Sequence, residues 1–407
     1  MPRRLKVLIS AYACEPGKGS EPEVGWQWTT RLARDHDVTV LTRANNAPAL
    51  HAALANRTEP QPQFLFYDLP GWLLRHKGKA LPTPLYYLFW QAAVRWRFRR
   101  VLRDFDLIHH LTFNSFRQPG FWWFTGRLVI LGPLGGGQVC PWPFLRRFGR
   151  RLPGELLRSL SVQASRVYPH LLLSFGCART ILVANADTAR RVPPCWRRKV
   201  RKLLETGISL DRIEPRPAAS NAGGLKLLWV SRLEKIKAGE LALMACAHAA
   251  REVPELQLTM VGSGPEESWL KQLASDLGVA SRVQWLGKVP HVRVTELMRT
   301  GDVFLFTSVR DTSGNVLLEA MAAALPAITL RHHGAAEIST DDTAIRIPPS
   351  TPEHTAEKMG AAIVRLARSP EVRRSMGEQA RRRVAEVFDW SAKVEQMSRF
   401  YRETVGD

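Results

Sequence analysis

The sequence has few cysteines, no long apolar run and no internal repeat. Its five cysteines are scattered through 407 residues without a CxxC pair. This spacing suits neither a disulfide framework nor a zinc site, and it predicts reduced thiols in a cytoplasm. No uninterrupted apolar stretch approaches the roughly 18 residues that a membrane-spanning helix needs, so no span is expected. The lack of a repeat of about 20 to 50 residues excludes a solenoid or a propeller.

The length and the composition indicate a folded protein of two domains. Hydrophobic residues make up 45% of the chain and charged residues 23%, which argues against wholesale disorder. A chain of 407 residues exceeds what one hydrophobic core usually serves. The apolar run near the N-terminus, at 5–10, is too short for a signal peptide and is interpreted as a first buried strand.

Positive charge is concentrated in the first half of the chain. The net charge is +21, and residues 1–217 hold 34 lysines and arginines against 14 aspartates and glutamates. Residues 218–407 hold 24 against 23 and are almost neutral. Because the excess is one-sided, we expect an anionic partner: a membrane surface, a phosphorylated lipid or nucleic acid.

Three stretches of this basic half mix arginines with apolar side chains, at 71–102, 142–152 and 188–202. Apolar-plus-basic helices suit a bilayer interface, where aromatic side chains bury at headgroup depth and arginine meets anionic lipid. The alternative for each stretch is a helix that faces the core and leaves a basic face in water. No RNA- or DNA-reading motif accompanies the charge, so nucleic acid is not the expected partner.

Strand-like and helix-like segments alternate through the first half, as in a doubly wound α/β domain. Strands are predicted at 5–10, 36–42 and 106–111. His109 and His110 stand at the end of the last of these, and strand alternation directs them to opposite faces. A histidine at the carboxyl edge of a parallel sheet is well placed for chemistry, because ligands bind at that edge.

A Pro-, Ala-, Ser- and Gly-rich segment at 211–224 predicts a linker. A second α/β series follows it, with strands at 225–230, 256–261, 282–287, 303–308 and 326–330. A last helix is expected over 388–405.

The stretch 303–329 is the most informative part of the chain. An apolar strand is followed by a polar loop at 308–315 and by a helical run from Val316 that stops at Pro326. Asp311 and Glu319 bracket the loop and the first turn of this helix. A strand, a small-residue loop and a helix N-terminus form a ready anion site, because free backbone N–H groups and the helix dipole face the ligand.

Several motifs together resemble a known family. VSRLEKIKAGE at 230–240, VGSGPE at 261–266, LGKVPH at 286–291 and DVFLFTS at 302–308 resemble the nucleotide-sugar half of GT-B glycosyltransferases, in particular the retaining family 4. In the first half, CEPGKGSEPEVGW, DLIHHLTFNSFRQPG and GPLGGG resemble a bacterial, group 1-type branch of that family.

The resemblance implies an α/β fold of the GT-B type, with two Rossmann-like domains facing across a cleft. Residues 1–215 would form a basic, membrane-facing, acceptor-binding domain, and residues 216–385 the nucleotide-sugar-binding domain. Residues 386–407 would form a C-terminal helix that packs back on the first domain, with Trp390, Met397 and Tyr401 as buried anchors.

The resemblance also implies roles for single residues. Arg232 and Lys237 would bind the diphosphate, and Glu319 would hydrogen-bond the ribose. Asp311 stands where the family usually has a glutamate and would contact the donor sugar with a shorter reach. The remaining implied contacts are backbone N–H groups of Ser313, Gly314 and Asn315, a loop with Gly17 and Gly19 that closes on the donor, and a histidine near the reacting carbon, either His109 or His110.

The resemblance therefore predicts a hexosyltransferase that uses a nucleotide-sugar such as a UDP- or GDP-sugar. The sugar would pass, with retention of configuration, to a lipid-linked or cell-surface polysaccharide precursor such as that of lipopolysaccharide. No DxD-type motif appears in the donor loops, so neither a metal nor another cofactor is expected. The predicted location is cytoplasmic, at the periphery of the inner membrane. The alternatives are a nucleotide-sugar epimerase of the same fold and a non-catalytic basic protein that binds membranes; a phosphorylase would need a pyridoxal-phosphate lysine site, which we do not find.

Overall fold

The structure is a computed structural model that describes residues 3–78, 81–113, 115–216 and 224–406. The chain divides into two compact units, neither of which is continuous in sequence. The first unit contains residues 1–137, 161–205 and 393–407, and the second contains residues 138–160 and 206–392. These ranges differ from the predicted domains, because 138–160, 206–215 and 386–392 group with the second unit. The predicted linker at 211–224 lies partly outside the described residues.

The first unit is built around a parallel sheet with the strand order β3-β2-β1-β4-β5-β6-β7. Its strands are β1 (Lys6–Ala11), β2 (Asp37–Thr42), β3 (Gln63–Phe66), β4 (Leu107–Thr112), β5 (Leu128–Leu134), β6 (Thr180–Val183) and β7 (Val200–Lys202). Its helices are α1 (Ser20–Leu32), α2 (Ala47–Leu54), α3 (Gly71–His76), α4 (Thr83–Arg97), α7 (Pro169–Cys177) and α8 (Ala186–Ala189). Helices α6 (Leu152–Ala164) and α16 (Trp390–Val405) each contribute residues to both units.

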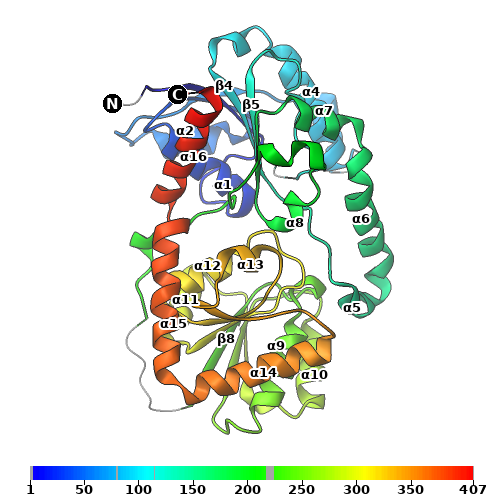
Figure 1. Cartoon of the computed structure of the whole chain (residues 1–407), viewed down its shortest axis with the longest axis vertical. Coiled ribbons are helices and arrows are strands. Elements are labelled where there is room, and N and C mark those ends of the chain that lie inside the picture. Colours follow the sequence, from blue (N-terminus) through cyan, green and yellow to red (C-terminus); the bar gives the residue numbers. More distant parts are fainter. Residues whose placement is uncertain (1–2, 79–80, 114, 217–223, 407) are drawn as a thin grey trace. The chain divides into compact units, whose positions relative to one another are not determined.

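The second unit has a parallel sheet with the order β10-β9-β8-β11-β12-β13. Its strands are β8 (Lys226–Val230), β9 (Gln257–Val261), β10 (Val283–Gly287), β11 (Val303–Phe306), β12 (Ala327–Leu330) and β13 (Ala344–Ile347). Its helices are α5 (Trp142–Leu145), α9 (Gly239–Ala249), α10 (Glu267–Asp276), α11 (His291–Thr300), α12 (Asn315–Ala322), α13 (His333–Ile338), α14 (Pro352–Arg368) and α15 (Pro370–Arg383). Helices α9, α10 and α14 lie together, and α11, α12 and α13 form a second group (Figure 1).

The central strands explain why both sheets are parallel. Every residue of β4 and of β11 is buried, as expected for strands that helices cover on both faces. Strand β8 pairs with β11 in parallel, with Val303 opposite Leu227 and Phe304 opposite Leu228. The carboxyl ends of these two neighbouring strands therefore open onto the same edge of the sheet.

The three apolar-plus-basic stretches do not form three amphipathic helices. The first contains the long helix α4, which exposes Leu85, Phe89 and Trp96. The second buries Phe144 and Phe148 in the core of the second unit, because its apolar side chains pack against that unit. The prolines of the third divide it into short pieces, the helix α8, a 3₁₀ turn at 194–199 and β7.

The last helix has the predicted buried anchors. Trp390, Met397 and Tyr401 are all buried. In the first unit, Ser398 bonds His36 at 3.0 Å and Thr404 bonds Thr180 at 2.9 Å. No helix in the described part of the chain combines the length and the apolar character needed to cross a membrane.

Candidate donor site

The loop after β8 carries Arg232 and is held in place by the loop after β9. The backbone N–H of Ser231 donates to Val261 O at 3.0 Å, and that of Leu233 donates to Ser263 O at 3.0 Å. Gly262 has a φ of +130°, and a Cβ there would lie 1.8 Å from Ser231 O. The VGSG part of the motif therefore allows two backbones to touch. Arg232 projects from this support with a side chain that is 69% exposed, and it pairs with Glu234 at 2.7 Å.

Lys237 and Asp311 meet at the carboxyl edge of the second sheet. The loop after β11 is bonded to the turn that ends at Lys237: Thr307 Oγ1 donates to Lys237 O at 2.7 Å, and Ser308 Oγ donates to Ile236 O at 3.1 Å. These bonds bring the Lys237 ammonium and the Asp311 carboxylate into an ion pair whose two side chains are each about four-fifths buried. The structure thus joins two of the residues that the sequence predicts for the site.

The N-terminus of α12 lies directly after this loop. Gly314 caps the helix in the left-handed conformation, with a φ of 79° and a ψ of 54°. A Cβ at Gly314 would lie 2.9 Å from Phe306 Cζ, so a larger residue does not fit without a shift. Ser313, Gly314 and Asn315 therefore stand at the positive end of a helix that starts at the sheet edge.

Glu319 lies one turn further along α12 and has a partner in the next helix. Its carboxylate accepts from His291 Nε2 at 3.3 Å, and His291 is the first residue of α11. The hydrogen bond to Glu319 raises the pKa of His291 above its usual value. A protonated His291 would offset the charge of Glu319 when no ligand is present.

A buried cluster beside the Asp311 loop was not predicted. Glu155 is 6% exposed and lies 3.5 Å from both Arg158 and Arg310. Gln138 Nε2 donates to Thr312 Oγ1 at 2.5 Å, and Arg158 donates to Gln138 O at 2.9 Å. The segment 138–160 thus contacts both ends of the loop 310–312. This supporting role becomes visible only in the structure, where the segment 138–160 groups with the second unit.

The predicted glycine loop lies in the first unit, between β1 and α1. Gly17 and Gly19 have φ values of +71° and +65°, and a Cβ at either position would meet no atom within 4 Å. The Gly17 N–H donates to the Glu23 carboxylate at 2.6 Å. These glycines are needed for their left-handed backbone and not for close packing. Their contact with a donor stays a prediction.

His109 and His110 are both completely buried in β4. His109 bonds Tyr401 Oη at 2.6 Å and Gly132 O at 2.6 Å, so both of its ring nitrogens have partners. His110 bonds Tyr87 Oη at 3.1 Å and accepts from Trp122 Nε1 at 3.2 Å. Burial lowers the pKa of His109 to about 4 and that of His110 to about 3, so both rings are neutral at pH 7. Neither ring has exposed surface, and a donor contact for either one stays a prediction.

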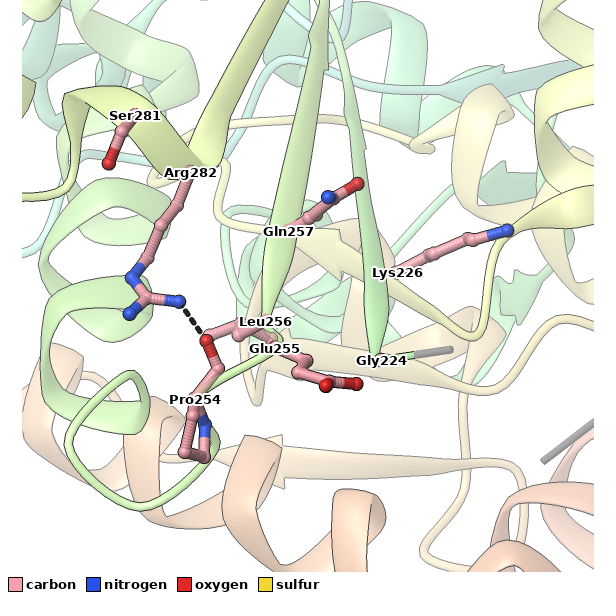
Figure 2. Close-up of a pocket in the computed structure, with 8 residues that line it drawn as sticks. All are labelled: Gly224, Lys226, Pro254, Glu255, Leu256, Gln257, Ser281 and Arg282. Carbon is pink, nitrogen blue, oxygen red and sulfur yellow. Dashed lines mark hydrogen bonds between the residues drawn. The ribbon is translucent and has the colours of Figure 1, made fainter. Parts of the chain in front are cut away.

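A pocket of about 530 Å³ lies elsewhere in the second unit, beside the amino ends of β8, β9 and β10. Figure 2 shows Lys226 and Gln257, the first residues of β8 and β9, together with Arg282, which donates to Pro254 O. Ligands of parallel α/β sheets bind at the carboxyl ends of the strands. This pocket is therefore at the wrong edge for the donor.

The two all-parallel Rossmann-like units define a GT-B fold. Sucrose-phosphate synthase of Thermosynechococcus elongatus has the same fold, with a TM-score of 0.61 over 98% of this chain and 99% of that chain, at 19% identity. The Anabaena protein HepE, solved in complex with UDP, gives a TM-score of 0.62 over 98% of this chain and 100% of that chain, at 16% identity. The predicted fold class is confirmed.

Residues 211–383 match the family model described as glycosyl transferases group 1, and over this region the chain belongs to that family. N-acetyl-alpha-D-glucosaminyl L-malate synthase of Bacillus anthracis is 33% identical over 182 residues, which is 44% of this chain and 46% of the relative. The chain thus spans about half the length of the curated relatives it matches. The group 1 glycosyltransferase assignment made from the motifs is confirmed.

Proposed function

We propose that this protein is a glycosyltransferase that moves a sugar from a nucleotide-sugar to a lipid-linked or polysaccharide-precursor acceptor. The observation that carries the proposal is the ion pair of Lys237 with Asp311 at the carboxyl edge of a group 1 family domain. It places a cation suited to a diphosphate beside a carboxylate suited to sugar hydroxyls. The complex of HepE with UDP supports a nucleotide-linked donor.

Each residue has a proposed task. Arg232 and Lys237 bind the diphosphate and stabilise the negative charge that grows on it as the sugar leaves. Asp311 contacts the sugar hydroxyls, Glu319 accepts from the ribose, and the backbone N–H groups of 313–315 contact the sugar and the phosphate. The loop with Gly17 and Gly19 is proposed to contact the donor as well.

The proposed reaction proceeds with retention and without a metal. The bond from the anomeric carbon to the diphosphate oxygen breaks, and a bond from that carbon to an acceptor hydroxyl oxygen forms on the same face. The hydroxyl proton passes to the departing diphosphate. No second carboxylate with the spacing of a glycosidase nucleophile is predicted, so positioning and charge neutralisation supply most of the acceleration.

The proposed location is the surface of an anionic membrane. Supporting features are the charge of residues 1–217 and the exposed Leu85, Phe89 and Trp96 of α4. Arginines at 95, 97, 99 and 100 lie on or next to the same helix. Aromatic side chains beside arginines are typical of interfacial helices.

A thermal-shift screen over UDP- and GDP-sugars tests donor binding, because a ligand of the folded state raises its melting temperature. Arg232→Ala should remove the shift. Arg293→Ala is the control, since Arg293 is an exposed arginine of the same unit that pairs with Glu296 at 2.8 Å. Equal shifts in the two variants would contradict the role of Arg232.

Incubation with radiolabelled nucleotide-sugars and bacterial membranes tests transfer. Label should enter a lipid or polysaccharide fraction, and chelation with EDTA should leave the rate unchanged. Folded protein that transfers label from no common donor would overturn the proposal. Conversion of the sugar nucleotide without any acceptor would favour the epimerase instead.

A further inference from the structure

The first unit contains an apolar pocket of about 670 Å³ at the carboxyl end of β4. It lies among α4, the loop that follows β4, the end of α6 and α7. Its apolar walls include Leu88, Phe113, Phe121 and Leu171. Pockets that bind small molecules typically have volumes of about 300–1,000 Å³. This pocket falls in that range and lies at the ligand-binding edge of the sheet.

The lining of the pocket carries positive charge. Among the described residues that line it, Arg117 is the one with a formal charge, and none is an aspartate or a glutamate. Arg117 Nη1 donates to Ser161 Oγ at 2.7 Å, which fixes the guanidinium at the wall of the pocket. A cation in apolar surroundings favours an anionic partner.

His170 adds uncharged polar groups to the same wall. Its ring packs against Phe121 at 4.5 Å and against Trp123 at 5.0 Å between centroids. Burial lowers its pKa to about 4, so the ring is neutral at pH 7. Neither ring nitrogen has a hydrogen-bond partner among the described residues. Because unpaired buried polar atoms are costly, this ring is suited to bonding a ligand.

Apolar side chains continue from the pocket to the protein surface. On α4, Leu85 and Phe89 are 42% and 48% exposed and directly follow the lining residues Pro84 and Leu88. At the other side, Tyr168 lines the pocket and is 60% exposed. Exposed apolar side chains are therefore found on the pocket lining itself, at Tyr168, and next to it in sequence on α4, and exposed apolar side chains suit contact with a lipid chain.

We propose that this pocket binds the apolar chain of an amphipathic acceptor, with the anionic group of that acceptor at Arg117. The inference rests on the proposed function and names its acceptor class. A polar sugar acceptor would leave the walls of Leu88, Phe113 and Phe121 unused. A neutral lipid would offer no anionic group to the guanidinium that lines the pocket.

Binding of three probes to the full chain tests this inference: decyl phosphate, ethyl phosphate and decanol, each at a concentration at which it stays monomeric. Calorimetry measures each affinity without a nucleotide-sugar. Decyl phosphate should bind at least tenfold more tightly than either of the others, because only it supplies both the chain and the anion. Equal affinities for decyl phosphate and ethyl phosphate would overturn the inference.

Three variants locate the binding. Ala164→Trp, which fills the pocket from the end of α6, should lower the affinities for decyl phosphate and for decanol at least tenfold. Arg117→Gln should lower the affinity for decyl phosphate by a similar factor and leave the affinity for decanol unchanged. Val167→Ala is the control, because Val167 is 75% exposed and does not line the pocket. Unchanged binding in Ala164→Trp would place the ligand elsewhere and refute the assignment.

The same proteins separate this inference from the proposed function. All three variants should keep the thermal shift with nucleotide-sugars, which also shows that they fold. If the wild type binds decyl phosphate with the expected chain dependence but no nucleotide-sugar, the proposed function fails while the ligand class of the pocket stands. If it binds nucleotide-sugars but not decyl phosphate, the pocket assignment alone fails.

Discussion

Lys237 and Asp311, 74 positions apart in the sequence, form a largely buried ion pair in the second unit. In this pairing the carboxylate neutralises the cation that the donor diphosphate would need. In the proposed donor complex, the diphosphate would therefore compete with Asp311 for Lys237.

This competition predicts opposite effects on UDP or GDP binding. Lys237→Met should weaken the preferred nucleoside diphosphate at least tenfold, because a fixed cation is lost. Asp311→Asn should raise the affinity for the same nucleoside diphosphate severalfold, because Lys237 is released. It should lower the affinity for the complete nucleotide-sugar, because a sugar contact is lost. Calorimetry checks both, with Lys358→Met on the exposed face of α14 as the control. Unchanged binding by Lys237→Met would exclude the diphosphate role.

The pair of His291 with Glu319 predicts a pH-dependent contribution to stability. The bond to Glu319 raises the pKa of His291 above its usual value of about 6.5. The contribution is thus fully present below that value and is lost as the pH rises through the raised pKa. Because His291 is exposed, the pair contributes only about 0.5 kcal/mol. His291→Gln should lower the melting temperature by about 1–2 °C at pH 5.5 and not at pH 9; a loss of equal size at both values would exclude the ionic pairing.

Glu155 predicts a larger loss of stability. Glu155→Gln removes the carboxylate charge that pairs with both Arg158 and Arg310, whose side chains are about four-fifths buried. Breaking a buried ion pair costs about 3 kcal/mol or more, and urea unfolding should show a loss of this order. Glu296→Gln, in an exposed pair on α11, should change the unfolding free energy by about 0.5 kcal/mol or less. Similar losses in both variants would show that the Glu155 cluster is not a structural support.

Gly262 and Gly278 form a matched test of the backbone contact below Arg232. Both have positive φ, at +130° and +69°, but a Cβ at Gly262 meets Ser231 O whereas one at Gly278 meets no atom within 4 Å. Gly278→Ala should cost about 1 kcal/mol, from backbone strain alone. Gly262→Ala should cost at least about 2 kcal/mol more and should also weaken nucleotide binding. Equal unfolding free energies for the two variants would contradict the contact.

The sequence predicted well those features that depend on neighbouring residues. The apolar run 303–306 forms β11, and the helix expected from Val316 begins at Asn315 and ends at Ala322, before Pro326. Both patterns are local, because strand burial and helix start signals need only a few adjacent residues. Lys237 and Asp311 were both predicted for the site, but their pairing was not, because it depends on β8 and β11 being neighbours in the sheet.

Features that depend on distant partners could not be predicted. Strand alternation predicted that His109 and His110 point to opposite faces of the sheet. It could not predict the tyrosines that bond them, because Tyr87 and Tyr401 come from other parts of the chain. The stretch 142–152 has the composition of an interfacial helix, and only the packing of Phe144 and Phe148 shows which core it joins. Charge and hydrophobic periodicity are properties of a segment alone, whereas the core against which the segment packs depends on the three-dimensional fold.

The interleaving of the two units has a consequence for synthesis on the ribosome. The chain passes from one unit to the other four times, at 137, 160, 205 and 392. Most of the first unit emerges early, yet Tyr401, which bonds the buried His109, is translated only after the whole second unit. The core of the first unit therefore stays incomplete until α16 has been translated. Nascent chains that end at Ala392 should expose this unit to proteases, and chains that include α16 should not.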